Sequence, residues 1–372
     1  MAHIICLGSV RWVKLGGRTQ NLLSRLSRHH KILYFQPPPS LISQDIRKGD
    51  HKKQAIHPQK NISLYTLPPV FHLNNYDHPR LLGYNVKKMT KYIQEKAKQE
   101  QIVDPLLWLC SPFYYALLDT LQYKGMVYDC YQDWSLFDIR WESIVANRAD
   151  ILFAASPGLA DHLAPCNTNI ALIPNGGNLS LYRKSEDLTL QAPDPLLRIP
   201  SPLLGYLGDV TRDVDLRPVY RAAKANPRWH FVFAGRCSRE NPLYQTLLNL
   251  NNVHFLGKVP QSELPVYGAH FDVLIELLDT DDPEEDVVSS RIYEYLMIGK
   301  PIVSMYPARY TPAYPDVIYG ARSPKEFSDQ CLQALMENSG YTALRRKQYG
   351  AEADWNLRAQ LAQQILENIS LL

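Results

Sequence analysis

The chain has 372 residues, of which 45% are hydrophobic and 21% charged, and a formal net charge of +3 at pH 7. At roughly 150 residues per domain, this length predicts two or three domains, and the composition excludes intrinsic disorder. No run of about 18 apolar residues occurs, and the first ten residues lack the features of a signal peptide, so we expect a cytoplasmic protein.

The first half of the chain alternates short apolar runs with longer polar or periodic segments. Strands are predicted at residues 3–7, 31–35, 62–65, 106–110, 126–129, 151–154 and 170–173. Helix-length segments between them lie at 19–27, 85–100, 114–121 and 157–162. This order is typical of a parallel α/β sheet.

The pattern restarts after a segment rich in glycine and proline. Residues 175–202 contain Asn175-Gly-Gly and four prolines but no periodic element, which is the composition of an interdomain connection. Beyond it, strands are predicted at 203–206, 230–234, 253–256, 272–275 and 301–304. We therefore predict one α/β domain at 1–174, a linker at 175–202 and a second α/β domain at 203–354.

Residues 289–304 are the most informative segment and predict a capped helix followed by a buried strand. Ser289 or Ser290 can cap the helix start, and Gly299 supplies a left-handed residue beyond its end. Pro301 prevents the helix from continuing into the strand. The start of this helix therefore presents free backbone amides.

Free amides and the positive end of the helix dipole favour an anion such as a diphosphate, and Arg291 adds a permanent charge beside them. Glu294 lies one turn further on, where its carboxylate could accept hydrogen bonds from ribose hydroxyls of the same ligand. A solvated amphipathic helix is the alternative, since Tyr293, Leu296 and Met297 also form an ordinary core stripe.

This segment resembles the corresponding helix of bacterial nucleotide-sugar glycosyltransferases of the family 4 and teichuronic-acid type. The resemblance extends over most of the chain, at 17–20, 32–38, 127–134, 175–176, 205–216, 229–235 and 253–260. It implies the GT-B fold, in which two Rossmann-like domains face each other across a cleft. It also leads us to expect that the C-terminal helix, 355–372, packs back on the first domain.

The resemblance implies a nucleotide-sugar site on the second domain. Gly208 would let the backbone approach the phosphates of the donor, because no side chain intervenes there. Arg291 and the amides around Ser289 and Ser290 would bind the diphosphate, and Glu294 would hold the ribose.

Further contacts are implied at the edge of this site. Lys258 and Val259 would meet the nucleobase through backbone groups, and Arg236 could face the cleft. A surface arginine at a strand end is the alternative interpretation of Arg236. Two departures from the family pattern, Gln132 and Asp286, put the sugar contacts in doubt.

Asp129 and Asp133 follow a predicted strand of the first domain, where an open α/β sheet places its ligands. A carboxylate there could steady the acceptor hydroxyl. The alternative is that these aspartates hydrogen-bond to the loops around Tyr131 and Trp134. The acidic sequence at 279–281 resembles a metal-binding DxD motif, but we expect no metal in this context.

The glycines of the first domain disfavour a dinucleotide dehydrogenase. Gly8, Gly16 and Gly17 do not form GxGxxG, and no acidic residue follows the second strand. We interpret residues 16–17 as a loop over the cleft, with Arg18 and Gln20 at the following helix start. A plain helix entry is the alternative.

We therefore predict a glycosyltransferase that moves a sugar from a UDP- or GDP-sugar to a glycan or lipid-linked acceptor in surface polysaccharide synthesis. Arg291 and the helix amides would stabilise the leaving diphosphate. No metal or further cofactor is expected, and the resemblance implies retention of anomeric configuration. A catalytically silent nucleotide-sugar-binding protein and a nucleotide-sugar epimerase are the alternatives.

Positive charge is concentrated in the first half, where residues 1–174 hold 20 Lys and Arg against 13 Asp and Glu. The stretch 47–60 and the lysines of 87–98 could hold the protein against the anionic inner membrane. Solvated helix faces explain the same lysines. We expect no nucleic-acid partner, because no basic patch interleaves with aromatic residues.

Overall fold

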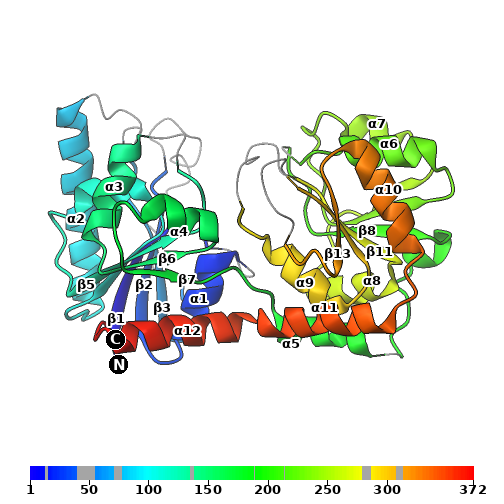
Figure 1. Cartoon of the computed structure of the whole chain (residues 1–372). Helices are drawn as coiled ribbons and strands as arrows, with labels where there is room; N and C mark the ends of the chain where they lie inside the picture. Colours follow the sequence, from blue (N-terminus) through cyan, green and yellow to red (C-terminus); the bar gives the residue numbers. More distant parts are fainter. Residues whose placement is uncertain are drawn as a thin grey trace. The chain divides into compact units, whose positions relative to one another are not determined.

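The computed structural model describes residues 1–12, 16–39, 55–70, 78–134, 138–187, 189–212, 214–278, 286–306 and 313–372. The chain divides into two compact units, unit 1 with residues 1–174 and 356–372, and unit 2 with residues 175–355. Each unit is an α/β structure with its own sheet, and both chain termini lie in unit 1 (Figure 1).

Unit 1 contains a seven-stranded sheet in the order β3-β2-β1-β4-β5-β6-β7. Its strands are β1 (His3–Leu7), β2 (Lys31–Gln36), β3 (Ile62–Thr66), β4 (Leu106–Leu109), β5 (Gly125–Cys130), β6 (Ile151–Ala154) and β7 (Ile170–Leu172). Its helices are α1 (Arg18–Leu26), α2 (Pro79–Gln99), η3 (Pro112–Leu117), α3 (Ile139–Arg148), α4 (Pro157–Leu163) and most of α12 (Trp355–Asn368). All strand pairs are parallel.

Unit 2 contains a six-stranded sheet in the order β10-β9-β8-β11-β12-β13, also parallel throughout. Its strands are β8 (Leu203–Leu207), β9 (His230–Ala234), β10 (Val253–Phe255), β11 (Val273–Glu276), β12 (Ile302–Met305) and β13 (Ile318–Ala321). Its helical segments are α5 (Leu179–Tyr182), η4 (Arg183–Glu186), η5 (Leu196–Arg198), α6 (Arg217–Ala225), α7 (Tyr244–Leu248), α8 (Leu264–His270), α9 (Ser290–Ile298), α10 (Pro324–Leu335) and α11 (Gly340–Glu352).

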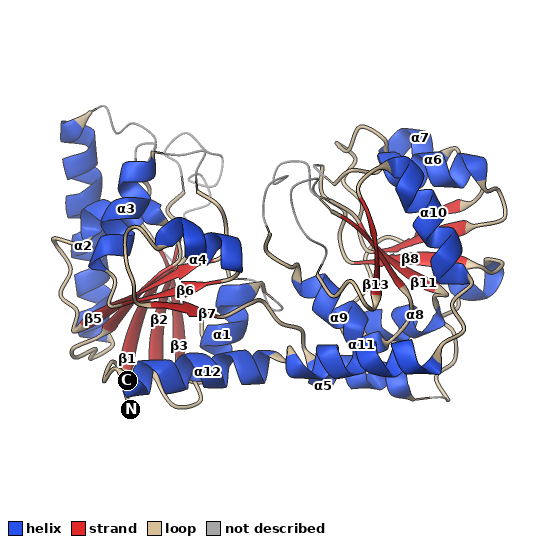
Figure 2. Ribbon diagram, in the orientation of Figure 1, coloured by secondary structure: helices blue, strands red, loops and turns tan. Residues whose placement is uncertain are grey.

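Helices cover both faces of the sheet of unit 2 (Figure 2). Strand β8 has an almost wholly apolar sequence because both of its faces are buried. Leu204 and Tyr206 enter the core beneath α6 and α10. Leu203 and Leu207 enter the opposite core, beneath α8 and α9. A strand buried on both faces needs apolar residues at every position rather than at alternate ones.

The order of strands reverses between β8 and β11 in unit 2, as it does between β1 and β4 in unit 1. Chain connections leave such neighbouring strands in opposite directions, so the space at their carboxyl ends remains open for ligands. The candidate site of unit 2 lies at this switch point, at the ends of β8 and β11 and the start of α9.

The predicted parallel α/β class is confirmed in both halves of the chain. Strand β13 was not predicted from the sequence. Residues 175–202, the expected linker, lie in unit 2 and include α5, η4 and η5. The acidic segment 279–281 and residues 47–54 of the basic stretch lie outside the described residues.

Candidate functional site

Helix α9 begins at the switch point with the cap that the sequence predicts. Ser289 is the N-cap, and its Oγ accepts a hydrogen bond from the backbone N–H of Ile292. Gly299 ends the helix in the left-handed conformation, with φ of 84°. The backbone N–H groups of Ser290 and Arg291 donate to no other described residue, so they form the open end of the helix.

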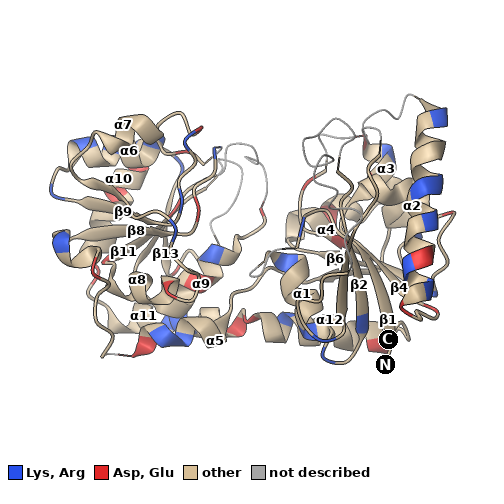
Figure 3. Ribbon diagram, turned by 180° about the vertical axis from the view of Figure 1, so that it is seen from behind, with Lys and Arg blue, Asp and Glu red and all other residues tan. Residues whose placement is uncertain are grey.

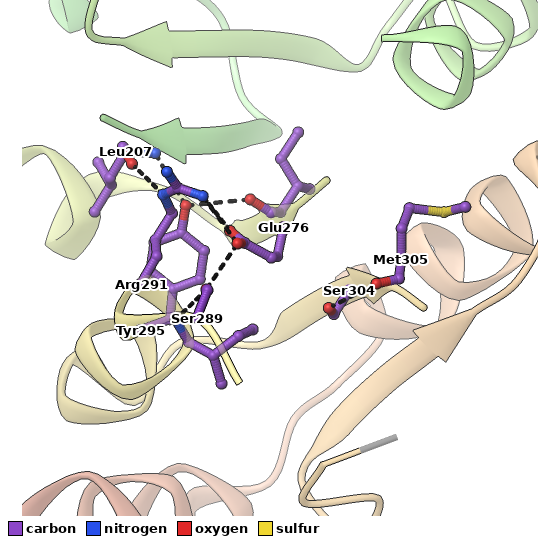
Figure 4. A network of polar contacts seen from close by, with 9 residues as sticks. Leu207, Glu276, Ser289, Arg291, Tyr295, Ser304 and Met305 are labelled. Carbon is purple, nitrogen blue, oxygen red and sulfur yellow. Dashed lines mark hydrogen bonds and ion pairs between the residues drawn. The ribbon is translucent and has the colours of Figure 1, made fainter. Parts of the chain in front are cut away.

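Arg291 is held by an ion pair with Glu276, the last residue of β11 (Figure 4). Its Nη1 donates to Oε1 and Oε2 of Glu276 at 2.8 and 2.9 Å, and its Nε donates to the carbonyl oxygen of Leu207 at 2.7 Å. Ser289 Oγ also donates to Glu276 Oε1, at 2.8 Å. The start of α9 is thereby tied to the ends of β8 and β11.

The remaining nitrogen of Arg291, Nη2, lies beside Gly208. A Cβ atom built on Gly208 would lie 3.6 Å from both Nε and Nη2 of Arg291. Gly208 has φ of +111°, a conformation that residues with side chains rarely adopt, which explains the glycine. Nη2 makes no hydrogen bond to any residue in the described part of the chain, so it is available to an anion over this glycine.

The guanidinium of Arg291 is charged at any ordinary pH. Burial alone would lower its pKa, but the charge of Glu276 and its hydrogen bonds raise the pKa well above the ordinary value. The guanidinium also stacks on Tyr206, with Cζ 4.3 Å from the ring centre. Since Glu276 balances the charge of Arg291, an anion bound here would depend on directed N–H groups and the helix dipole more than on net charge.

Glu294 lies on the same helix, one turn beyond Arg291. Its Oε2 accepts a hydrogen bond of 2.8 Å from the hydroxyl of Tyr182. Burial raises the pKa of Glu294 to about 7, although Tyr182 and Arg291 both act in the opposite direction. The carboxyl group therefore titrates at a higher pH than an ordinary glutamate.

Arg236 and Lys258 approach the site from the neighbouring strand ends. Arg236 follows β9, is largely exposed and pairs with Asp209, with Nη2 2.6 Å from Oδ2. Burial would raise the pKa of Asp209, but Arg236 and Lys258 lower it below the ordinary value. Val259 packs against the core under α9. Arg236 and Lys258 are thus gathered around Asp209, directly after Gly208.

Asp129 of unit 1 is fully buried at the end of β5 and forms an ion pair with Arg18. Arg18 Nε lies 2.8 Å from Asp129 Oδ1, and Arg18 Nη1 donates to the carbonyl oxygen of Ile173 at 2.5 Å. Burial raises the pKa of Asp129 despite this partner. This placement indicates a structural role for Asp129, because a group inside the core does not meet an acceptor. The partner of its carboxylate is Arg18 of α1, and not the loops around Tyr131 and Trp134. Asp133 lies beyond the strand and is partly exposed.

The candidate site also contains two residues of unit 2 that the sequence did not indicate, Glu276 and Tyr182. Glu276 has one sequence signal, since it is a single acidic residue inside the apolar run 273–278. The family pattern instead directed attention to Asp286. Tyr182 has no such signal, because it lies in the expected linker. Among the described residues, no group of three or more His, Cys, Asp or Glu side chains could hold a metal ion.

No family model matches the chain. The curated protein described as a putative teichuronic acid biosynthesis glycosyltransferase, TuaH of Bacillus subtilis, is 24% identical over 276 residues, which are 67% of this chain and 68% of that protein. Sucrose-phosphate synthase from Thermosynechococcus elongatus has a similar structure, with a TM-score of 0.71 and 14% identity, over 100% of this chain and 99% of that one. HepE from Anabaena in complex with UDP has a TM-score of 0.64 and 16% identity over all of both chains.

These findings confirm two predictions made from the sequence. The chain has the GT-B fold, and it resembles the glycosyltransferases of teichuronic-acid type. As an enzyme it falls in the glycosyltransferase class.

The buried pair of Asp129 and Arg18 leads to a stability prediction. Asp129→Asn removes a charge and leaves Arg18 buried without its counter-ion. We therefore expect the free energy of unfolding to fall by about 3 kcal/mol. Urea unfolding followed by circular dichroism measures the effect. Asp209→Asn is the matched control, since its partner Arg236 is exposed and the loss should be much smaller. Equal losses in the two variants would contradict the structural role of Asp129.

Proposed function

We propose that this chain transfers a sugar from a nucleoside diphosphate sugar, UDP- or GDP-linked, to a glycan or lipid-linked acceptor, with the donor bound at the switch point of unit 2. The observation that carries this proposal is the orientation of Arg291. Glu276 and the Leu207 carbonyl hold the guanidinium so that Nη2 lies over Gly208. A diphosphate placed there would also meet the open amides of α9. The UDP in the HepE structure supports this choice of ligand class.

The chemistry follows from what these groups can stabilise. When the bond between the sugar and the β-phosphate oxygen breaks, negative charge develops on the departing diphosphate. Arg291 Nη2 and the N–H groups of Ser290 and Arg291 are fixed before the reaction, so they stabilise that charge without rearranging. In this proposal they neutralise the leaving group and no metal ion takes part. Glu294 would hold the ribose, and Asp133 is the candidate in unit 1 for positioning the acceptor hydroxyl.

The acceptor and the stereochemistry are inferred from the relatives. The name of the Bacillus protein refers to teichuronic acid biosynthesis, which supports a glycan or lipid-linked acceptor. Retention of anomeric configuration follows from the family that the sequence resembles. The relatives give no support to the alternatives of a silent binding protein or an epimerase.

The first test is a panel of UDP-, GDP-, ADP- and dTDP-sugars, with nucleotide binding and nucleotide release followed together. We expect release from one donor. The double variant Arg291→Met with Glu276→Gln removes both charges of the buried pair and should weaken nucleotide binding at least about ten-fold, or 1.4 kcal/mol. The matched control, Arg217→Met with Asp215→Asn, removes a pair of unit 2 whose arginine is exposed, and it should bind as the parent does.

The remaining outcomes of this test separate the alternatives. Binding without release, even with membrane lipid extract as acceptor, would indicate a silent binding protein. Conversion of one donor into another without release would indicate an epimerase. If no nucleotide bound, the proposed function would be wrong.

We also infer that α2 contacts an anionic membrane surface. One face of this helix carries exposed residues at spacings of three and four, formed by Arg80, Tyr84, Lys87, Lys91, Glu95 and Lys98. Glu95 Oε1 lies 3.9 Å from Lys91 Nζ, so the face holds four basic residues against one acidic residue. The opposite face packs on unit 1 through residues such as Met89 and Ile93. Figure 3 colours the ribbon of α2 blue at several Lys and Arg positions and red at an acidic position among them. No helix in the described ranges is long and apolar enough to span a bilayer.

Vesicle sedimentation tests this membrane contact. We expect binding to vesicles with 30 mol% phosphatidylglycerol, as a rough working composition, and little binding to pure phosphatidylcholine. The triple variant Lys87→Glu, Lys91→Glu and Lys98→Glu should lose most of this binding, because each basic residue near the surface contributes about 1 kcal/mol. Lys224→Glu, Lys300→Glu and Lys325→Glu make the same change of net charge in unit 2. Equal losses in the two triple variants would contradict a role for α2.

A further inference from the structure

Tyr182 ends the short helix α5 and is fully buried in unit 2. Its ring belongs to the core cluster beneath α8 and α9. Its hydroxyl donates to Glu294 Oε2 at 2.8 Å. A phenylalanine would fill the same space in the core, so packing alone does not account for the hydroxyl group.

The backbone before Tyr182 lies tightly against α9. A Cβ atom on Gly177 would lie 2.9 Å from Met297 Cε and 3.3 Å from the backbone nitrogen of Glu294. Gly177 also donates to the carbonyl oxygen of Ala353, at 3.0 Å. The backbone N–H of Leu179 donates to Asp354 Oδ2 at 2.9 Å. The segment that leads to Tyr182 is therefore fixed at two points in unit 2.

The second carboxylate oxygen of Glu294, Oε1, accepts no hydrogen bond from the residues that the structure describes. Three groups act on this carboxylate from the elements around it: Tyr182 from α5, Arg291 from the preceding turn of α9 and Glu276 from β11. Arg291 is engaged by Glu276 and Leu207. Tyr182 is thus the group that fixes the rotation of the Glu294 carboxylate.

We propose that Tyr182 is a positioning residue of the nucleotide site, and that its hydroxyl holds one oxygen of Glu294 so that the other is presented to a ribose hydroxyl. This inference rests on the proposed function, in which Glu294 meets the ribose. It adds a residue that touches no ligand and acts through Glu294.

Tyr182 also affects the protonation of Glu294. A hydrogen bond to a carboxylate stabilises its ionised form, and here it opposes the burial that raises the pKa to about 7. Without the hydroxyl, the pKa of Glu294 rises further. A larger fraction of the protein at pH 7 then carries a protonated carboxyl, which is a poorer acceptor for a ribose hydroxyl.

The experiment measures the Kd of the nucleoside diphosphate that binds best among UDP, GDP, ADP and dTDP, from pH 5.5 to 8.5. For Tyr182→Phe we expect about ten-fold weaker binding at pH 7, the loss typical of a hydrogen bond to a charged group. We also expect the midpoint of the pH profile to move to higher pH. Glu294→Gln gives the pH dependence of the ligand alone and should lack this midpoint.

Tyr319→Phe is the matched control. Tyr319 lies on β13 and its hydroxyl donates to Glu337 Oε2 at 2.9 Å, so the same kind of tyrosine–glutamate bond is lost in the same unit. This variant can lower stability, but it should bind nucleotide with the profile of the parent. A change of stability in Tyr182→Phe without a shift of the pH midpoint would show a merely structural role.

The outcomes separate this inference from the proposed function. If Glu294→Gln weakens binding while Tyr182→Phe keeps the affinity and pH midpoint of the parent, the positioning role is wrong and the proposed function stands. If Glu294→Gln also binds as the parent does, Glu294 does not meet the ligand and the inference is overturned with it. If the parent binds no nucleotide, both are wrong.

Discussion

The ion pair between Glu276 and Arg291 is the interaction on which the rest of unit 2 depends. The desolvation free energy of two charges exceeds the free energy of their attraction unless hydrogen bonds satisfy both groups. Here Glu276 accepts two hydrogen bonds from Arg291 and one from Ser289, and Arg291 also donates to Leu207. Because Glu276 alone would be a buried unpaired charge, the pair fixes the start of α9 to the ends of β8 and β11.

Helix α9 is held at its other end by a buried arginine. Arg346 of α11 is 0% exposed, and its Nη1 donates to the carbonyl oxygen of Gly299, the C-cap of α9. Its Nε donates to Val317, and it forms an ion pair with Glu337. With both ends held and one face buried, α9 has little freedom to move within unit 2. The N–H groups at its start are therefore placed before any ligand arrives, which is what stabilisation of a developing charge requires.

Local features of this arrangement are readable from the sequence, and distant pairings are not. Ser289 and Gly299 predict the bounds of α9 because capping depends on residues within one turn. Glu276 could not be paired with Arg291 in advance, because their contact follows from the order of strands in the sheet. The short strand β13, Ile318–Ala321, contains a glycine and lacks a clear apolar pattern. The buried pair of Asp129 and Arg18 could not be predicted from the sequence either, because 111 positions separate the two residues.

A crystal structure of the protein with the nucleoside diphosphate that it binds best would show whether the pair of Arg291 and Glu276 prepares the site. We predict diphosphate oxygens within hydrogen-bonding distance of Arg291 Nη2 and of the N–H groups at the start of α9, over Gly208. We also expect the pair of Arg291 and Glu276 to persist in the complex. A nucleotide bound elsewhere on the chain, or one that displaces Arg291 from Glu276, would contradict the claim that this pair prepares the site.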